Sequence, residues 1–138
     1  MDKTALINEA LKARKYSYSP YSHFSVGAAL LTKSGDIITG CNIENATYGA
    51  TNCAERTAFF KAVSGGVTSF EAIAIAGGDD GDDIPNDYAY PCGICRQVMR
   101  EFCNPEEFIV IVARDDKNYK EYKLCELMPY SFGPENLL

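Results

Sequence analysis

The alternation of apolar and polar positions predicts that helices and strands follow one another along most of the chain. Near the N-terminus, apolar side chains recur at helical spacing with charged residues between them. Two apolar segments separated by the polar turn at residues 33–36 are typical of a β-hairpin. The expected elements, in chain order, are a helix at 3–16, strands at 24–32 and 37–43, a helix at 53–63, a strand at 70–76, a helix at 92–102, and strands at 108–113 and 119–124.

This order of elements predicts an α/β protein in which helices cover a sheet. Helices and strands alternate through the middle of the chain, and such alternation is typical of a three-layer α/β sandwich. A chain of 138 residues is expected to form one domain, residues 1–138, around one core. The tail that begins at residue 126 is expected to be short and irregular.

The composition narrows the possible partners and the cellular location. The formal net charge is −6 and no cluster of lysine and arginine stands out, which argues against nucleic acid as a substrate. No apolar run approaches the ~20 residues of a membrane span, and the N-terminus lacks the apolar core of a secretory signal. We therefore expect a cytoplasmic protein with no membrane partner. In that reducing compartment the six cysteines are expected to be metal ligands or free thiols, not disulfides.

Two short cysteine motifs predict a zinc site. Cys92 and Cys95 are three positions apart, so one helical turn can direct both thiolates toward the same ion. Cys53 supplies a third ligand from elsewhere in the fold, which leaves a fourth tetrahedral position open for water. Each motif begins a predicted helix, where the partial positive charge stabilises thiolates. We predict one Zn²⁺ per chain, held by these three cysteines.

The residues that follow Cys53 are candidates for the catalytic chemistry. Glu55 is close enough to the open zinc position to move protons there, although a carboxylate is also favourable in any first helical turn. Three thiolates leave the zinc core with net negative charge, and Arg56 is the nearby cation that offsets it, unless its side chain faces solvent. The spacing C-x-E followed by P-C-x-x-C is the signature of zinc-dependent nucleoside and nucleobase deaminases.

Other polar residues have simpler interpretations. Cys41, Cys103 and Cys125 offer a fourth ligand for a structural, non-enzymatic Cys₄ zinc module, but they are expected to be buried small side chains. His23 is the only histidine in the chain. We expect it to be structural or on the surface. The acidic stretch at 77–89 lacks the spacing of a calcium loop, so we expect a solvated loop.

Beyond these motifs, the chain resembles the small, three-cysteine type of cytidine deaminase over almost its whole length. Five blocks carry the resemblance in order, at residues 18–30, 40–46, 53–58, 91–98 and 126–132. The resemblance implies a three-layer α/β/α sandwich around a five-stranded mixed sheet, the cytidine deaminase-like fold. It also implies zinc-dependent hydrolysis of cytidine and deoxycytidine to uridine and deoxyuridine, with release of ammonia, in pyrimidine salvage. A related aminonucleoside deaminase is the alternative enzyme.

The resemblance also assigns substrate contacts, to Phe24, Asn42, Glu44, Tyr48, Ala54 and Phe132. Phe24 would pack on the pyrimidine, Asn42 and Glu44 would bind the ribose, and the Ala54 N–H would hold the base carbonyl. Tyr48 and Phe132 would reach into a neighbouring subunit, which implies a homotetramer with shared active sites and a free nucleoside as the substrate.

Two positions depart from the family pattern. Residues 49–52 replace the proline and apolar residue that usually follow Tyr48, so a changed loop is expected there. Tyr90 precedes Pro91 where the family usually has serine or threonine. We expect the second change to be tolerated if only the backbone carbonyl at that position contacts the substrate.

Overall fold

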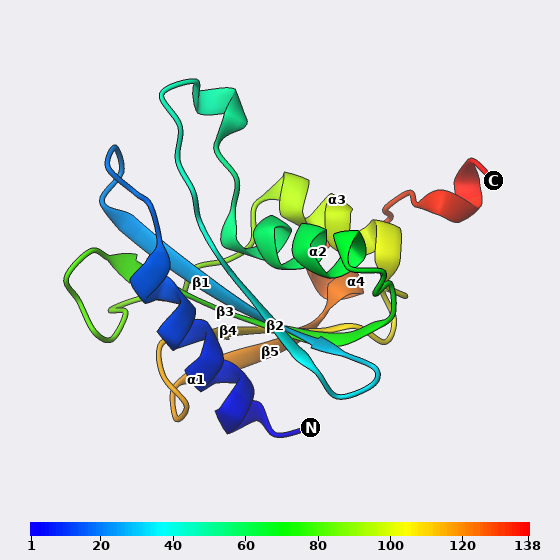
Figure 1. The fold of residues 1–138 in the computed structure, drawn as a ribbon. Coiled ribbons are helices and arrows are strands. Elements are labelled where there is room, and N and C mark those ends of the chain that lie inside the picture. Colours follow the sequence, from blue (N-terminus) through cyan, green and yellow to red (C-terminus); the bar gives the residue numbers. More distant parts are fainter.

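The computed structural model of the protein describes residues 1–138, and it has a five-stranded sheet with helices on both faces (Figure 1). The elements are α1 (Lys3–Ala13), β1 (Phe24–Thr32), β2 (Ile37–Cys41), α2 (Ala54–Ser64), β3 (Phe70–Asp79), α3 (Gly93–Phe102), β4 (Ile109–Ala113), β5 (Tyr119–Lys123) and α4 (Leu124–Leu127), with 3-10 turns at Arg14–Tyr16, Tyr48–Ala50 and Pro134–Asn136. The strand order is β2-β1-β3-β4-β5. Strands β3 and β4 are parallel and the other pairs are antiparallel, so the predicted mixed sheet is confirmed.

Two apolar cores lie on opposite faces of the sheet. Helix α1 covers one face, where Leu6 and Ile7 pack on small residues of the central strands. Helices α2, α3 and α4 cover the other face, where Phe59, Met99 and Phe108 lie in the larger core. Strand β3 is therefore buried on both sides, which explains its nearly continuous apolar sequence.

Close packing sets the position at which α2 begins. A Cβ atom on Gly40 of β2 would lie 2.5 Å from both the Ala54 carbonyl oxygen and the Ala58 backbone nitrogen. Any larger residue at position 40 would thus push the first turns of α2 away from β2. Because Cys53 and Glu55 lie at this end of α2, Gly40 helps to place the candidate catalytic residues.

Several predicted boundaries were wrong, including the end of β2, which lies at Cys41 and not at residue 43. Helix α1 ends at Ala13 and continues only as a 3-10 turn. Strand β3 continues to Asp79, because Asp79 pairs with Phe24 at the start of β1. The tail is not irregular throughout: α4 starts at buried Leu124, and Glu126 caps it by accepting a 2.9 Å hydrogen bond from the Lys123 N–H.

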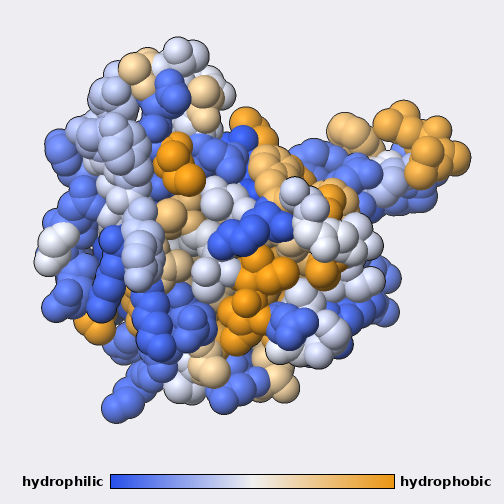
Figure 2. Space-filling model, viewed as in Figure 1, coloured by the Kyte–Doolittle hydropathy of each residue, from blue (hydrophilic) through white to orange (hydrophobic).

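Two segments project from the body of the protein. Residues 44–51 form a loop that is closed at its base by paired backbone hydrogen bonds, each 2.9 Å long, between Ile43 and Asn52. The C-terminal segment leaves α4 and projects on the side of α3 (Figure 1). Figure 2 shows hydrophilic residues over α1 and apolar residues around α2 and at the C-terminal end. No helix has both the length and the apolar character needed to cross a membrane.

Candidate active site

Three cysteine sulfurs meet where α2 and α3 begin side by side. Cys53 is the N-cap of α2, Cys92 is the N-cap of α3, and Cys95 is buried in the first turn of α3. Their Sγ atoms all lie within 4.8 Å of one another, and those of Cys53 and Cys92 are 3.8 Å apart. Tetrahedral zinc with Zn–S bonds of about 2.3 Å requires sulfurs separated by about 3.8 Å. The cluster therefore fits Zn²⁺ in both ligand type and spacing.

No fourth cysteine, histidine or carboxylate belongs to this cluster. Cys41 ends β2, Cys103 follows α3 and Cys125 lies in α4. Cys103 is buried, and burial raises the pKa of its thiol to about 12. Cys41 and Cys125 are only half-buried, so the expectation that all three are buried was wrong for these two. A closed Cys₄ site is not assembled, and the three-thiolate set leaves one tetrahedral position open.

The thiols of Cys53 and Cys95 differ in how readily they lose a proton. A hydrogen bond from Cys95, followed by one from Arg56, lowers the pKa of the Cys53 thiol to about 5. The same hydrogen bond to Cys53, together with burial, raises the pKa of Cys95. One thiolate therefore forms readily, and like-charge repulsion opposes the next. A divalent cation removes that repulsion, which is why binding of such an ion releases thiol protons.

The Arg56 guanidinium reaches the cluster from α2. Its Nη2 donates a 3.3 Å hydrogen bond to the Cys53 sulfur. Although burial lowers the pKa of Arg56, hydrogen bonds to Cys53 and Cys95 outweigh that effect and raise it. Its buried Nε has no hydrogen-bond partner in the chain. This arrangement places a permanent positive charge beside the sulfurs, as required to offset the charge of three thiolates.

Glu55 presents a buried carboxyl group in the first turn of α2. The residue is 4% exposed, and burial raises the pKa of its carboxyl group to about 7 in the metal-free protein. The negative charge of Cys53 raises this pKa further, whereas Arg56 opposes the increase. A carboxyl group that titrates near neutrality can both accept and donate a proton at physiological pH.

Three of the predicted substrate residues lie along one edge formed by β1 and the chain after β2. The Asn42 amide donates a 2.8 Å hydrogen bond to the Phe24 carbonyl and accepts a 2.9 Å bond from the Val26 N–H. This pair of bonds holds Phe24, whose ring is partly exposed, at the start of β1. The amide keeps one N–H and one lone pair for a ligand.

Glu44 is held by the turn that precedes Phe24. Its carboxylate accepts hydrogen bonds from the Tyr21 N–H, at 2.9 Å, and from the backbone and hydroxyl of Ser22. The Ser22 hydroxyl, with these backbone groups, lowers the pKa of Glu44. Ser22 was not among the predicted substrate contacts, although it lies inside one of the matching blocks. Glu44 is thus a fixed, ionised acceptor.

Ala54 is the first residue of α2 and is fully buried. Its backbone N–H is among those at a helix start that have no partner within the helix, and no other acceptor in the chain pairs with it. The N–H is therefore available to a ligand carbonyl beside the cluster, as the resemblance requires.

Tyr48 and Phe132 lie on the two projecting segments and not in the body of the protein. Their side chains are 76% and 61% exposed. The Tyr48 ring meets Tyr21 edge-on, with 6.0 Å between the ring centroids, and the family-divergent residues after Tyr48 form a 3-10 turn.

Tyr90 lies against the sheet edge. Its hydroxyl is 2.9 Å from that of Tyr122 on β5. The backbone carbonyl of the next residue, Pro91, accepts a 2.8 Å hydrogen bond from Arg96 of α3. The Tyr90 ring is therefore tied to β5, while α3 fixes the backbone that leads into Cys92.

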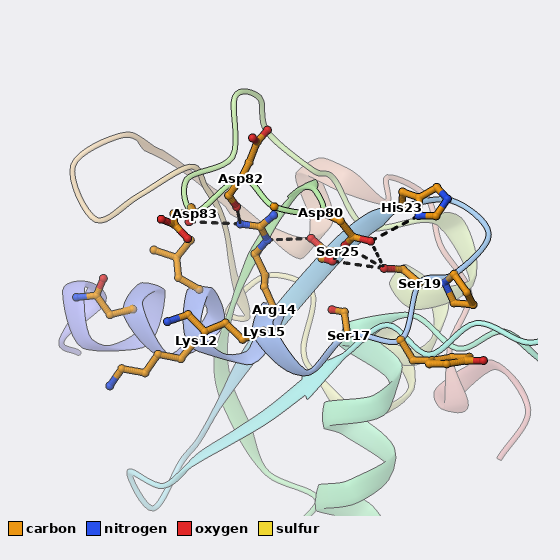
Figure 3. Close-up of a pocket in the computed structure, with 15 residues that line it drawn as sticks. Lys12, Arg14, Lys15, Ser17, Ser19, His23, Ser25, Asp80, Asp82 and Asp83 are labelled. Carbon is orange, nitrogen blue, oxygen red and sulfur yellow. Dashed lines mark hydrogen bonds and ion pairs between the residues drawn. The ribbon is translucent and has the colours of Figure 1, made fainter.

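A large cavity lies apart from the cysteine cluster. Its volume is about 820 Å³, and its lining comes from α1, the 17–25 segment and the acidic loop after β3 (Figure 3). Buried Arg14 donates to the carbonyl oxygens of Ser25 and Asp82, at 2.9 and 3.0 Å. Asp80 accepts from Ser19 and Ser25, and exposed His23 lies 3.9 Å from it. The loop is mostly exposed, as expected, but it is anchored and not free in solvent.

Comparison with known proteins identifies close relatives. Residues 1–112 match the family model described as the cytidine and deoxycytidylate deaminase zinc-binding region. The chain is 49% identical over 137 residues to a cytidine deaminase of Sporosarcina psychrophila, covering 99% of this chain and 96% of the relative. It is 48% identical over 137 residues to that of Halalkalibacterium halodurans, covering 99% and 98%. The crystal structure of the Burkholderia pseudomallei cytidine deaminase superimposes with a TM-score of 0.85 at 42% identity, covering 96% of this chain and 100% of the other.

Proposed function

The chain belongs to the cytidine deaminase family, and we propose that it catalyses zinc-dependent hydrolytic deamination of cytidine to uridine, with release of ammonia. The observation that carries the proposal is the cluster itself. Three cysteine sulfurs, which would leave one coordination position of a zinc ion open, lie beside a buried carboxyl group at two helix N-termini. This is the arrangement of a hydrolytic zinc centre and not of a structural one.

The proton transfers are assigned to Glu55. Cys53, Cys92 and Cys95 would hold a zinc ion, which would supply a Lewis acid that lowers the pKa of water toward ~7. Glu55 would take a proton from the attacking water and deliver it to N3 of the base, which makes C4 more electrophilic. The water oxygen then bonds to C4. As the C4–N4 bond breaks, Glu55 carries the remaining proton of that oxygen to the leaving amino group, so water and cytidine give uridine and ammonia. Its burial supports both roles, because a desolvated carboxyl group holds and releases protons near neutral pH.

The substrate is oriented by groups that the fold has already fixed. The Ala54 N–H is free to donate to the base carbonyl, and Phe24 offers an apolar ring to the pyrimidine. Glu44 accepts from the ribose 3′-hydroxyl, with Asn42 beside it. An ionised carboxylate at that position repels a 3′-phosphate, so free nucleosides are favoured over nucleotides. None of these contacts requires a 2′-hydroxyl, and deoxycytidine is therefore a second substrate.

The active form is a homotetramer in which neighbouring subunits complete each site. Support comes from the two projecting segments, which carry the exposed rings of Tyr48 and Phe132 away from the chain's own body. A ring that is exposed in one chain becomes buried when it enters the substrate site of another, and aromatic residues are favoured in such contacts.

The proposed activity is tested by following the absorbance of cytidine with purified, zinc-loaded protein. Loss of absorbance is expected with cytidine and deoxycytidine, and cytidine 3′-monophosphate is expected to react poorly because of the Glu44 charge. A chelator should abolish the reaction and added zinc should restore it, since the ion supplies the Lewis acid. Absence of turnover with both nucleosides, in protein with one zinc per chain, would contradict the proposal and favour a related aminonucleoside as the substrate.

Shared sites are tested by mixing two impaired variants and assaying them at a cytidine concentration below KM. Phe132→Ala should raise KM, because a ring that packs on the neighbour's substrate is lost. Co-refolding Phe132→Ala with Glu55→Ala chains should restore part of the activity, since some sites then combine an intact Glu55 with a neighbour's intact Phe132.

The matched control is Phe60→Ala, which removes a half-exposed ring on α2 outside the projecting segments. Phe60→Ala chains should keep a normal KM. Refolding each impaired variant alone should give no gain, and an absence of recovery in tetramers that contain both variants would show that each chain completes its own site.

A further inference from the structure

The segment that carries Phe132 is held to the body of the protein at two side chains of α3. Residues 129–138 form hydrogen bonds among themselves, but their hydrogen bonds to the rest of the chain all come from Gln97 and Arg100. Gln97 donates to the Phe132 carbonyl oxygen at 3.2 Å. The orientation of the Phe132 ring therefore depends on a small number of contacts.

Arg100 forms the stronger of these attachments. Its Nε donates to the Ser131 hydroxyl at 2.9 Å, and its terminal nitrogens bind both oxygens of the Glu135 carboxylate, one of them at 3.2 Å. The guanidinium thus binds the chain on both sides of Phe132, at Ser131 and at Glu135. Arg100 is 8% exposed, whereas the Glu135 side chain is 59% exposed, so solvent reaches this two-point ion pair from the side of the carboxylate.

Gly133 shows how closely the tail lies on this guanidinium. A Cβ atom at position 133 would lie 2.2 Å from Nη1 and 2.6 Å from Cζ of Arg100. The φ angle of Gly133 is −149°, which any residue can adopt. Glycine is therefore required because the Arg100 guanidinium lies so close, and not because of the backbone conformation. Because Ser131 and Glu135 hold the guanidinium, a methyl group there would displace it from its partners.

We propose that Arg100 is a positioning residue that fixes the C-terminal segment so that Phe132 is presented to a neighbouring subunit's substrate site. The proposal rests on the shared sites described under the proposed function. A segment ordered before association loses little further conformational freedom when it meets the neighbour and its substrate, and this pre-ordering improves binding without a new contact. Arg100 acts through Phe132 and does not touch the substrate.

The test is kinetic, with Arg100→Met, which keeps much of the apolar stem of the side chain. KM for cytidine should rise about tenfold, equivalent to the loss of one charge-assisted contact, with kcat nearly unchanged. Zinc content and tetramer mass should be normal, and amide hydrogen exchange should increase in residues 129–138. Gly133→Ala should produce the same changes by displacing the guanidinium. Lys61→Met is the matched control, because it removes a positive charge from the exposed last turn of α2 and should leave KM unchanged.

A double-mutant cycle separates this inference from the shared-site proposal. If Arg100 acts through the ring, Arg100→Met should add nothing to the KM of Phe132→Ala. A normal KM for Phe132→Ala would overturn the shared site itself. A raised KM for Phe132→Ala with a normal KM for Arg100→Met would overturn only the role of Arg100. An additive effect in the double variant would also overturn it. Exchange of the charges in Arg100→Glu with Glu135→Arg should recover part of the loss, which a purely structural defect would not.

Discussion

Replacing Glu55 with alanine is expected to reduce kcat by about 10²- to 10⁴-fold, the usual size of a general acid–base contribution. The carboxyl group is buried beside the cysteine cluster, so bulk water does not easily take over its proton transfers. It is not one of the three clustered ligands, and zinc content should stay at one per chain. The measurements are steady-state kinetics with cytidine and metal analysis of the same preparation.

Two controls make this result specific to proton transfer. Glu55→Gln keeps the size of the side chain and loses its acid–base function, so it should be nearly as inactive as Glu55→Ala. Glu71→Ala removes an exposed carboxylate from β3 and should be fully active. Near-normal turnover by either Glu55 variant, with zinc bound, would assign the proton transfers to another group.

The zinc ligands could be predicted from the sequence because their geometry is mostly local. Cys92 and Cys95 are spaced by one helical turn, and a helix does begin at Cys92. Cys53 opens the other helix, and Gly40 permits the close contact between β2 and α2 that places it. The helices and strands followed from equally local signals, since alternation of apolar positions marks them. The five-stranded mixed sheet was implied by the family resemblance.

The supporting contacts could not be predicted because they join residues far apart in sequence through single polar groups. Arg100 meets Ser131 across 31 positions, and Arg14 meets the Asp82 carbonyl across 68. Nothing in the sequence around either arginine distinguishes it from an arginine that faces solvent on a helix. Hydropathy patterns indicate which face of an element is buried, but they do not indicate which backbone carbonyl a buried guanidinium will bind.

Replacing Cys95 with alanine is expected to lower zinc affinity by more than about 100-fold, beyond the ten- to hundredfold cost of losing a residue that merely supports a ligand. Only two thiolate ligands remain in this variant, and the other cysteines lie outside the cluster and cannot replace the third. Deaminase activity should disappear with the metal. The fold is expected to persist, because the core between the sheet and α2, α3 and α4 contains many buried residues besides Cys95.

Cys103→Ala is the matched control for this loss. Cys103 follows the same helix and is also buried, with a thiol whose pKa burial raises to about 12, so it acts as a small apolar group. Its removal should cost about 1 kcal/mol of stability and leave zinc and turnover intact. Competition with a chromogenic chelator measures the affinity, and circular dichroism measures the fold. Tight zinc binding by Cys95→Ala would mean that a different side chain completes the metal site, and an unfolded variant would mean that zinc holds the two helix starts together.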